Sequence, residues 1–328
     1  MRGSASLRTA ERAGRHAILL QERDLAMLHS LAEAQLLTAE CLEWLHAPSW
    51  RTRYRRCAEQ ASDMSAKPYK PNSNLYRRLR GLCEYQYIRR ITRAVDHARG
   101  GYYRLPDAFL LARSGAEILE ERWGIELETV SVRFYRTRAI QNLDHAIAIG
   151  RLYAALRAEL EYRGRQFAYW QGDTLLSRGA YDRIPVVGVR EPLPILPDAT
   201  FVLDTMRYVV EIDRGTRPLR SWAEKIRAYE AYQGSARLAT RYQTDQFRVL
   251  IVAPTPTRLM RIAEEIARVT RQASADYLLL HAEHVHPTTI RRGWQRIVSI
   301  EWTPWRMVDR LIEEPTLTLA PHPLWENV

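Results

Sequence analysis

Acidic residues flank two neighbouring apolar runs near the middle of the chain. Asp198 opens one run, and Glu211 and Asp213 stand two residues apart at the end of the next. Residues two apart in a strand share a face, and a hairpin through 204–207 can bring Asp198 to that face. Converging carboxylates suit a hard cation such as Mg²⁺ or Mn²⁺, which also binds water and phosphate. We therefore expect Asp198, Glu211 and Asp213 to bind a divalent metal ion.

A single lysine follows these acids. The chain has only three lysines against 46 arginines, and two of them, Lys67 and Lys70, lie in a polar N-terminal stretch. Lys225 therefore stands out against a strong bias toward arginine. A compact ammonium acts on phosphate as a point charge, unlike the planar guanidinium of arginine. We expect Lys225 to complete the catalytic set; the alternatives are a surface lysine or an ordinary ion pair.

The positive charge is concentrated in one segment. The chain of 328 residues carries a net charge of +11, and residues 51–104 hold fourteen Lys or Arg against four Asp or Glu. Such a patch favours a phosphate backbone as partner. A membrane surface is the competing partner, but these residues do not form one face of a long amphipathic helix. Double-stranded DNA is the expected partner.

Composition also limits the class of protein. No apolar run is long enough to span a membrane, and the polar residues 1–14 lack the apolar segment of a secretory signal. The three cysteines, Cys41, Cys57 and Cys83, are widely spaced and odd in number, which fits neither a disulfide framework nor a zinc site. The expected location is the cytoplasm.

The basic segment lies within a winged helix-turn-helix pattern. Apolar spacing predicts helices, then two strands around a turn, then a closing helix, the order of a winged-helix domain. The predicted elements are helices 21–35, 38–45, 72–84 and 111–123 and strands 87–91 and 101–105. Candidate DNA contacts are Asn74, Arg77, Arg78 and Arg80 on the third helix and Arg89, Arg90 and Arg104 on the strands. The alternative is a small helical domain that binds protein.

The second half alternates strands and helices. Predicted strands are 167–170, 200–203, 207–212, 247–253 and 277–280, and predicted helices are 141–161, 221–232 and 257–271. Hairpins followed by alternating elements indicate a mixed sheet covered by helices. The fold class is therefore α/β, or α+β overall, divided into a polar tail (1–20), a winged helix (21–124), a linker (125–140) and an α/β domain (141–328).

The acidic motifs resemble those of the PD-(D/E)XK nuclease superfamily. Pro197-Asp198 heads one strand and Glu211 lies on the next, although Asp213 stands where that motif has its lysine. Lys225, on the following helix, is placed to supply the missing ammonium. The resemblance implies a restriction-endonuclease-like domain and a possible Mg²⁺-dependent DNA endonuclease, or nickase.

The whole order of motifs, from Arg23 to Pro254, resembles the replication-relaxation family of bacterial mobile-element proteins. Its most specific part is the Glu-x-Asp-Arg-Gly-Thr block at 211–216, followed by Lys225 and Tyr229 four residues apart. Further matches are Arg23-Asp24-Leu25, Ser114-Gly115 and His145. The resemblance implies plasmid replication or mobilisation, with nicking or relaxation of DNA and other mobilisation or replication proteins as possible partners. The alternative is an inactive, nuclease-like DNA-binding regulator or adaptor.

Two C-terminal patterns compete with this interpretation. His284-Val285-His286, with His281 as a third ligand, resembles the metal site of tyrosine relaxases, but Pro287 follows at once and no Tyr-x-x-Lys pattern occurs. The tryptophans of the tail could stack on single strands, although packing against the sheet is the more ordinary role. We therefore expect no covalent tyrosine chemistry.

Overall fold

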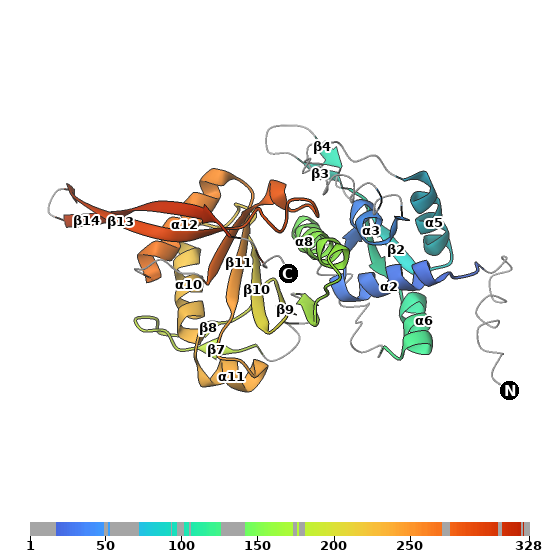
Figure 1. Cartoon of the computed structure of the whole chain (residues 1–328), viewed down its shortest axis with the longest axis horizontal. Coiled ribbons are helices and arrows are strands. Elements are labelled where there is room, and N and C mark those ends of the chain that lie inside the picture. The colour runs from blue at the N-terminus through green and yellow to red at the C-terminus, as the bar shows by residue number, and fades with distance from the viewer. Residues whose placement is uncertain are drawn as a thin grey trace.

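The structure is a computed structural model. It describes residues 18–48, 52, 72–92, 94–96, 102–104, 106–125, 142–172, 176, 181–270, 276–307, 310–322 and 324. The predicted polar tail, most of the basic insertion 48–71 and nearly all of the predicted linker lie outside these residues. The chain forms an N-terminal unit of helices with a small sheet, and a second unit built on a large mixed sheet (Figure 1).

The N-terminal unit follows the predicted order of helices. Its elements are α2 (Glu22–Ala34), β1 (Leu37–Thr38), α3 (Ala39–His46), α5 (Ser73–Glu84), β2 (Ile88–Ile91), β3 (Ala94–Asp96), β4 (Tyr102–Arg104), β5 (Ala108–Leu111) and α6 (Arg113–Trp123). Leu75, Leu79 and Leu82 of α5 are buried, as their spacing predicts. Thr38 caps α3 by accepting a hydrogen bond from the amide of Cys41 at 3.3 Å, at the start of the predicted helix 38–45.

The strands of this unit pair differently from the prediction. β5 lies between β1 and β2 in a three-stranded antiparallel sheet, whereas β3 pairs with β4. The predicted helix 111–123 therefore begins later, at Arg113. Residues 108–111 are all buried, because β5 is the central strand and is covered on both faces. A short, wholly apolar run gives no periodicity that distinguishes a strand from a helix end.

A seven-stranded mixed sheet forms the second unit, which confirms the predicted class. Its order is β14-β13-β12-β11-β10-β9-β6, in which β10–β11 and β11–β12 are parallel pairs and the other pairings of the described residues are antiparallel. The strands are β6 (Tyr169–Gly172), β9 (Ala199–Leu203), β10 (Met206–Ile212), β11 (Arg248–Ala253), β12 (Tyr277–His281), β13 (Gln295–Met307) and β14 (Arg310–Pro321). β13 and β14, which the sequence analysis did not predict, form a long hairpin that extends past the helices (Figure 1).

Helices cover both faces of this sheet. The parallel strands are joined through α10 (Arg220–Tyr232) and α11 (Ala236–Tyr242), then through α12 (Pro256–Thr270). Trp222, Ile226 and Tyr229 of α10 are buried with strand residues in one apolar core. The opposite face packs against α8 (Leu143–Tyr162) and shares a second core with the N-terminal unit. A short hairpin, β7 (Arg183–Ile184) with β8 (Leu193–Pro194), contacts α10.

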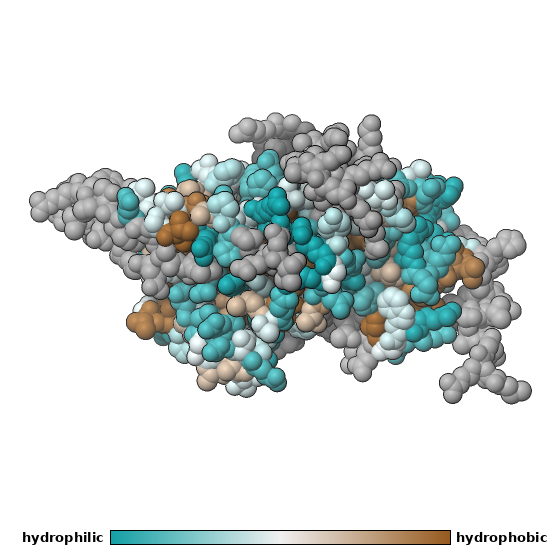
Figure 2. All heavy atoms as spheres, viewed as in Figure 1, coloured by the Kyte–Doolittle hydropathy of each residue, from teal (hydrophilic) through white to brown (hydrophobic). Residues whose placement is uncertain are grey.

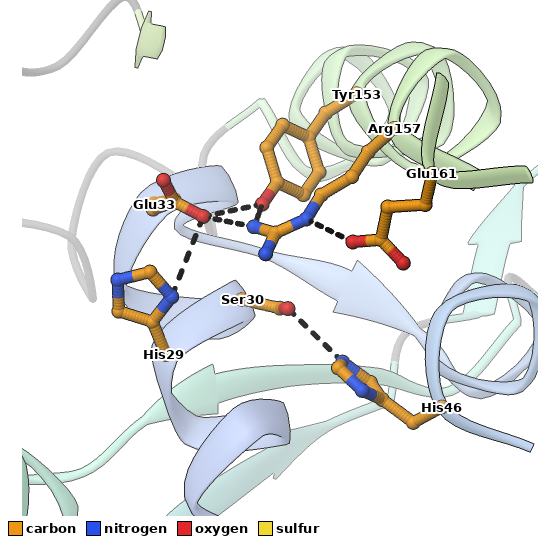
Figure 3. A network of polar contacts seen from close by, with 7 residues as sticks. All are labelled: His29, Ser30, Glu33, His46, Tyr153, Arg157 and Glu161. Atoms are coloured by element: carbon orange, nitrogen blue, oxygen red, sulfur yellow. Dashed lines mark hydrogen bonds and ion pairs between the residues drawn. The ribbon is translucent and has the colours of Figure 1, made fainter. Parts of the chain in front are cut away.

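α8 lies between the sheet and the N-terminal unit and is tied to both (Figure 1). On the N-terminal side, Glu33 of α2 accepts hydrogen bonds from the Tyr153 hydroxyl, at 2.7 Å, and from Arg157 (Figure 3). Arg151 of α8 also pairs with Glu40 of α3 at 2.6 Å. These partly buried contacts fix α8 against α2 and α3.

The surface is mostly polar on the face shown in Figure 2, with hydrophobic side chains in small separate groups. The exposed large hydrophobic residues, among them Leu19, Trp123 and Val187, lie in separate parts of the chain. Within the described part of the chain, no helix is both long and apolar enough to cross a bilayer.

Candidate functional site

A pocket of about 480 Å³ opens at one edge of the large sheet. Its lining comes from three places: the start of α8, the ends of the β9–β10 pair with the following loop, and the first turns of α10. The lining residues are Asn142, Leu143, Asp144, His145, Asp198, Glu211, Ile212, Asp213, Arg214, Thr216, Arg217, Ser221, Trp222 and Lys225. All four predicted catalytic residues are therefore in one pocket.

Asp198 lies beside Glu211 because of the strand register. Ala199 pairs with Val210 in the antiparallel β9–β10 ladder, and the Asp198 amide donates to the Val210 carbonyl at 2.9 Å. The next pair outward is therefore Asp198 with Glu211, and directly opposed residues project from the same face. The sequence prediction that these two carboxylates converge is supported by this register.

Both oxygens of Asp198 accept hydrogen bonds. His145 of α8 donates from Nε2 to Oδ1 at 2.9 Å, and the backbone amide of Ile212 donates to Oδ2 at 2.7 Å. Burial acts to raise the pKa of Asp198, but the hydrogen bond and charge of His145, the charge of Lys225 and the Ile212 amide outweigh it. The pKa of Asp198 is therefore below its usual range, and the carboxylate is ionised at neutral pH.

Glu211 is more deeply buried and is held by two side chains of α10. Only 2% of its side chain is exposed, and it accepts hydrogen bonds from Lys225 Nζ and from the Tyr229 hydroxyl. Burial raises the pKa of Glu211 and the nearby Asp198 adds to this, against the opposing effect of Lys225. Lys225 and Tyr229 are one turn apart on α10, so both reach the same carboxylate.

Asp213 lines the pocket, but its carboxylate is engaged elsewhere. Arg258 of α12 donates from Nε and Nη2 to its two oxygens at 2.6 and 3.2 Å, and only 3% of the Asp213 side chain is exposed. The same guanidinium donates to the Arg217 carbonyl at 2.7 Å. Asp213 thus shares the strand face of Glu211, as predicted, but forms a two-pronged ion pair there.

Two carboxylates of the site fit a divalent cation, whereas the predicted third does not. Mg²⁺ is commonly held by one or two carboxylates, with water and phosphate completing its shell. Asp198 and Glu211 are opposed across one strand pair and provide such a set. Among the described residues, no group of three or more His, Cys, Asp or Glu side chains is close enough to hold a metal ion. The bidentate contact with Arg258 explains why Asp213 does not complete one.

The predicted DNA contacts fall into two groups. Asn74, Arg77 and Arg80 of α5 and Arg89 and Arg90 of β2 are exposed, and Arg104 lies on β4. Arg78, by contrast, is directed inward. It donates to Asp24, which is fully buried, with Nε 2.8 Å from Oδ1. The helical spacing placed Arg78 on the outer surface, but the buried charge of Asp24 provides it with a partner inside the fold.

The C-terminal histidines do not converge on a metal site in the described structure. His281 lies 3.1 Å from the Pro254 carbonyl, and His286 is buried beside Thr288. Their ring nitrogens thus have contacts with neighbouring protein groups. Trp294 is buried in the core, so its predicted packing role is confirmed, whereas the side chains of Trp302, Trp305 and Trp325 lie outside the described residues.

His145 and Arg258 contact the predicted acids but were not among the predicted site residues. His145 had a sequence signal, since it fits the motif order from Arg23 to Pro254. Arg258 had no signal, because it is one arginine among 46 and its partner is 45 residues away.

Gly115, in the same motif order, has a structural role. A Cβ at this position would lie 2.2 Å from the carbonyl oxygen of Tyr87.

Comparisons with known proteins place these features in a family. A search of curated proteins gives no match. Among solved structures, the crystal structure of protein VC1899 from Vibrio cholerae matches with 11% identity and a TM-score of 0.28, over 83% of this chain and 56% of that one. This likeness is too weak to support an argument. The model of the replication-relaxation family matches residues 28–246, most of the chain and all four predicted catalytic residues, and the chain therefore belongs to the replication-relaxation family.

Proposed function

We propose that this protein binds double-stranded DNA and nicks or relaxes it by metal-dependent hydrolysis of a phosphodiester. Family membership points to replication or mobilisation of mobile elements. The observation that carries the proposal is the convergence of Asp198, Glu211, Lys225 and His145 in one pocket. Acids for a metal ion and cations for phosphate are the groups that phosphodiester hydrolysis requires.

The residues of the pocket have distinct roles in this proposal. Asp198 and Glu211 would hold Mg²⁺ or Mn²⁺, which when bound polarises the scissile phosphate and favours ionisation of a water. Lys225 lines the pocket with 27% of its side chain exposed, so its ammonium can reach a phosphate oxygen while still near Glu211. It would stabilise the extra negative charge of the transition state. His145 holds Asp198 in place.

The N-terminal unit would dock the duplex as a winged helix. Its helices, its three-stranded sheet and the β3–β4 pair follow one another in the order of a winged-helix fold. Arg77 and Arg80 of α5 and Arg89 of the neighbouring β2 are exposed, and Arg90 of β2 is exposed while it pairs with Asp107 at 2.5 Å. Exposed arginines on one helix and an adjacent strand suit phosphate contacts on either side of a groove.

A specific observation favours a second candidate, a non-catalytic DNA-binding adaptor. Glu211 already accepts hydrogen bonds from Lys225 and Tyr229, so each oxygen of its carboxylate has a protein donor. In this version the acids and their partners hold β10 to α10, and DNA binding alone provides the function. For catalysis, Lys225 would have to release Glu211 so that the carboxylate could hold a metal ion.

Nicking of supercoiled plasmid separates the two candidates. The purified chain should convert supercoiled to open-circular DNA with MgCl₂ and not with EDTA, and Asp198→Asn should abolish the conversion. Lys225→Arg keeps the charge but replaces a compact ammonium with a broad fork, so a catalytic lysine should fail. Arg227→Lys, on the same helix and outside the pocket lining, is the matched control. No nicking by the wild type would favour the adaptor, whereas normal nicking by Lys225→Arg would remove Lys225 from the catalytic set.

A further inference from the structure

The loop after β10 carries an arginine without a protein partner at the pocket. Arg217 lines the pocket and is exposed, and within the described part of the chain no group pairs with its guanidinium. Arg214 also lines the pocket, but Asp144 lies 3.0 Å from it and offsets its charge. Of the two arginines of this loop, Arg217 therefore has its hydrogen-bond donors available for a ligand.

The backbone of Arg217 is fixed by the ion pair between Asp213 and Arg258. Arg258 donates to both oxygens of Asp213 and, through Nη2, to the Arg217 carbonyl at 2.7 Å. Between them, Gly215 has a φ of 71°, in the left-handed region that glycine adopts without strain. The partly buried guanidinium of Arg258 thus holds both ends of a tight turn, and this turn fixes the position of the Arg217 backbone.

We propose that Asp213 and Arg258 form an anchor that presents Arg217 as the binding group for a backbone phosphate of a nucleic-acid strand lying in the pocket. The inference rests on the proposed function and assigns Asp213 a different role, as a positioning residue rather than a metal ligand. Guanidinium forms paired hydrogen bonds with phosphate oxygens. The volume of about 480 Å³ is within the range of pockets that hold small ligands, so a nucleotide-sized segment fits.

Charge explains why the pocket needs this residue. Asp198 and Glu211 repel a phosphodiester, and the hydrogen-bond donors facing them are already engaged, Lys225 with Glu211 and His145 with Asp198. Arg217, a cation in the lining of the same pocket that is unpaired among the described residues, would attract the strand without competing for the acids. The phosphate at Arg217 is then a neighbour of the scissile phosphate, and Arg217 contributes to strand affinity rather than to the chemical step.

Binding of a labelled strand tests the proposal without catalysis. The probe is a fluorescein-labelled 12-nucleotide single strand in EDTA, titrated with the full chain at several salt concentrations and followed by anisotropy. Arg217→Gln should weaken binding about tenfold, the loss expected for one charge-assisted contact, and lower the salt slope by about 0.7. Arg220→Gln removes an exposed charge three residues away, outside the pocket lining, and should change neither.

The anchor is tested by coupling and by metal response. Asp213→Asn should weaken strand binding as Arg217→Gln does. The double variant should lose little more affinity than either single variant, because both substitutions remove the same contact with phosphate. Asp213→Asn should also keep any rise in melting temperature caused by MgCl₂, whereas Asp198→Asn should lose it. A lost MgCl₂ response in Asp213→Asn would restore that residue as a metal ligand and overturn the anchor.

Normal strand binding by Arg217→Gln overturns the subsite, whatever the wild type does to plasmid. Arg217 is exposed, so this variant decides the proposal even where Asp213→Asn does not fold. Weakened strand binding by Arg217→Gln, in a wild-type chain that fails to nick, supports the subsite and refutes only the proposed hydrolysis. The two proposals therefore fail separately.

Discussion

Lys225→Met should destabilise the fold by leaving the carboxylate of Glu211 buried without its counter-charge. Removing one partner of a buried ion pair costs about 3–5 kcal/mol. Here Glu211 is 2% exposed and Lys225 is 27% exposed, so the pair is partly screened and the lower value, about 3 kcal/mol, applies. At about 2 °C per kcal/mol for a chain of this size, the melting temperature should fall by about 6 °C.

The assay is thermal unfolding in EDTA, followed by circular dichroism at pH 5 and pH 8. Because burial raises the pKa of Glu211 in the folded chain, the cost of its charge is absent below the unfolded value of 4.5 and grows as pH rises through the folded value. The melting difference between Lys225→Met and wild type should therefore be larger at pH 8 than at pH 5. Adding Glu211→Gln should restore most of the loss, since the amide carries no charge.

A melting temperature of Lys225→Met within about 1 °C of wild type at both pH values would refute this reasoning. It would show that Glu211 is not buried as a charged group, or that solvent replaces Lys225 without cost. A loss that is equal at both pH values, and that Glu211→Gln does not restore, would instead point to lost packing of the lysine side chain.

The remaining predictions concern DNA binding and acid stability. Arg77→Ala with Arg80→Ala should weaken duplex binding and lower the slope of log K against log salt by about two units, measured by anisotropy. Arg78→Ala should instead lower the melting temperature, because it leaves Asp24 buried and unpaired. The pKa of Asp198 is lower in the folded chain than its unfolded value of 3.8. The ionised carboxylate therefore stabilises the fold above pH 3.8, and this stabilisation disappears as pH falls through the folded pKa. The melting difference between wild type and Asp198→Asn should shrink below pH 4.

The long helices and the central strands were predictable because their apolar residues repeat at the correct period. Leu75, Leu79 and Leu82 all lie in the core, and the predicted strand 207–212 corresponds to β10. The β13–β14 hairpin was not predicted, because prolines and charged residues interrupt the alternation of apolar and polar residues along both strands. The two strands also pair mainly with each other rather than with the rest of the sheet. A hairpin is recognised in a sequence by its turn residues, and the residues between β13 and β14 do not form a typical turn sequence.

The candidate site was predictable only as far as local geometry reaches. The convergence of Asp198 with Glu211 follows from a hairpin register, and the reach of Lys225 follows from one helix, α10. The partner of Asp213 could not be predicted, because spacing along a strand determines a face and not which distant side chain covers it. Arg258 belongs to α12, which is separated from Asp213 along the chain by α10, α11 and β11. A tertiary ion pair with Arg258 thus gives Asp213 a different partner from Glu211, although the two acids share a strand face.

α8 connects the two parts of the proposed activity. Arg151 and Arg157 fasten it to α3 and α2 of the N-terminal unit, and His145 in its first turn holds Asp198 of the pocket. One rigid helix therefore spans from the docking unit to the acidic site. Because a helix rises about 1.5 Å per residue, the distance between these contacts is fixed by chain length rather than by a linker. In the proposed function, α8 would therefore hold the pocket at a constant separation from the N-terminal unit that would dock the duplex.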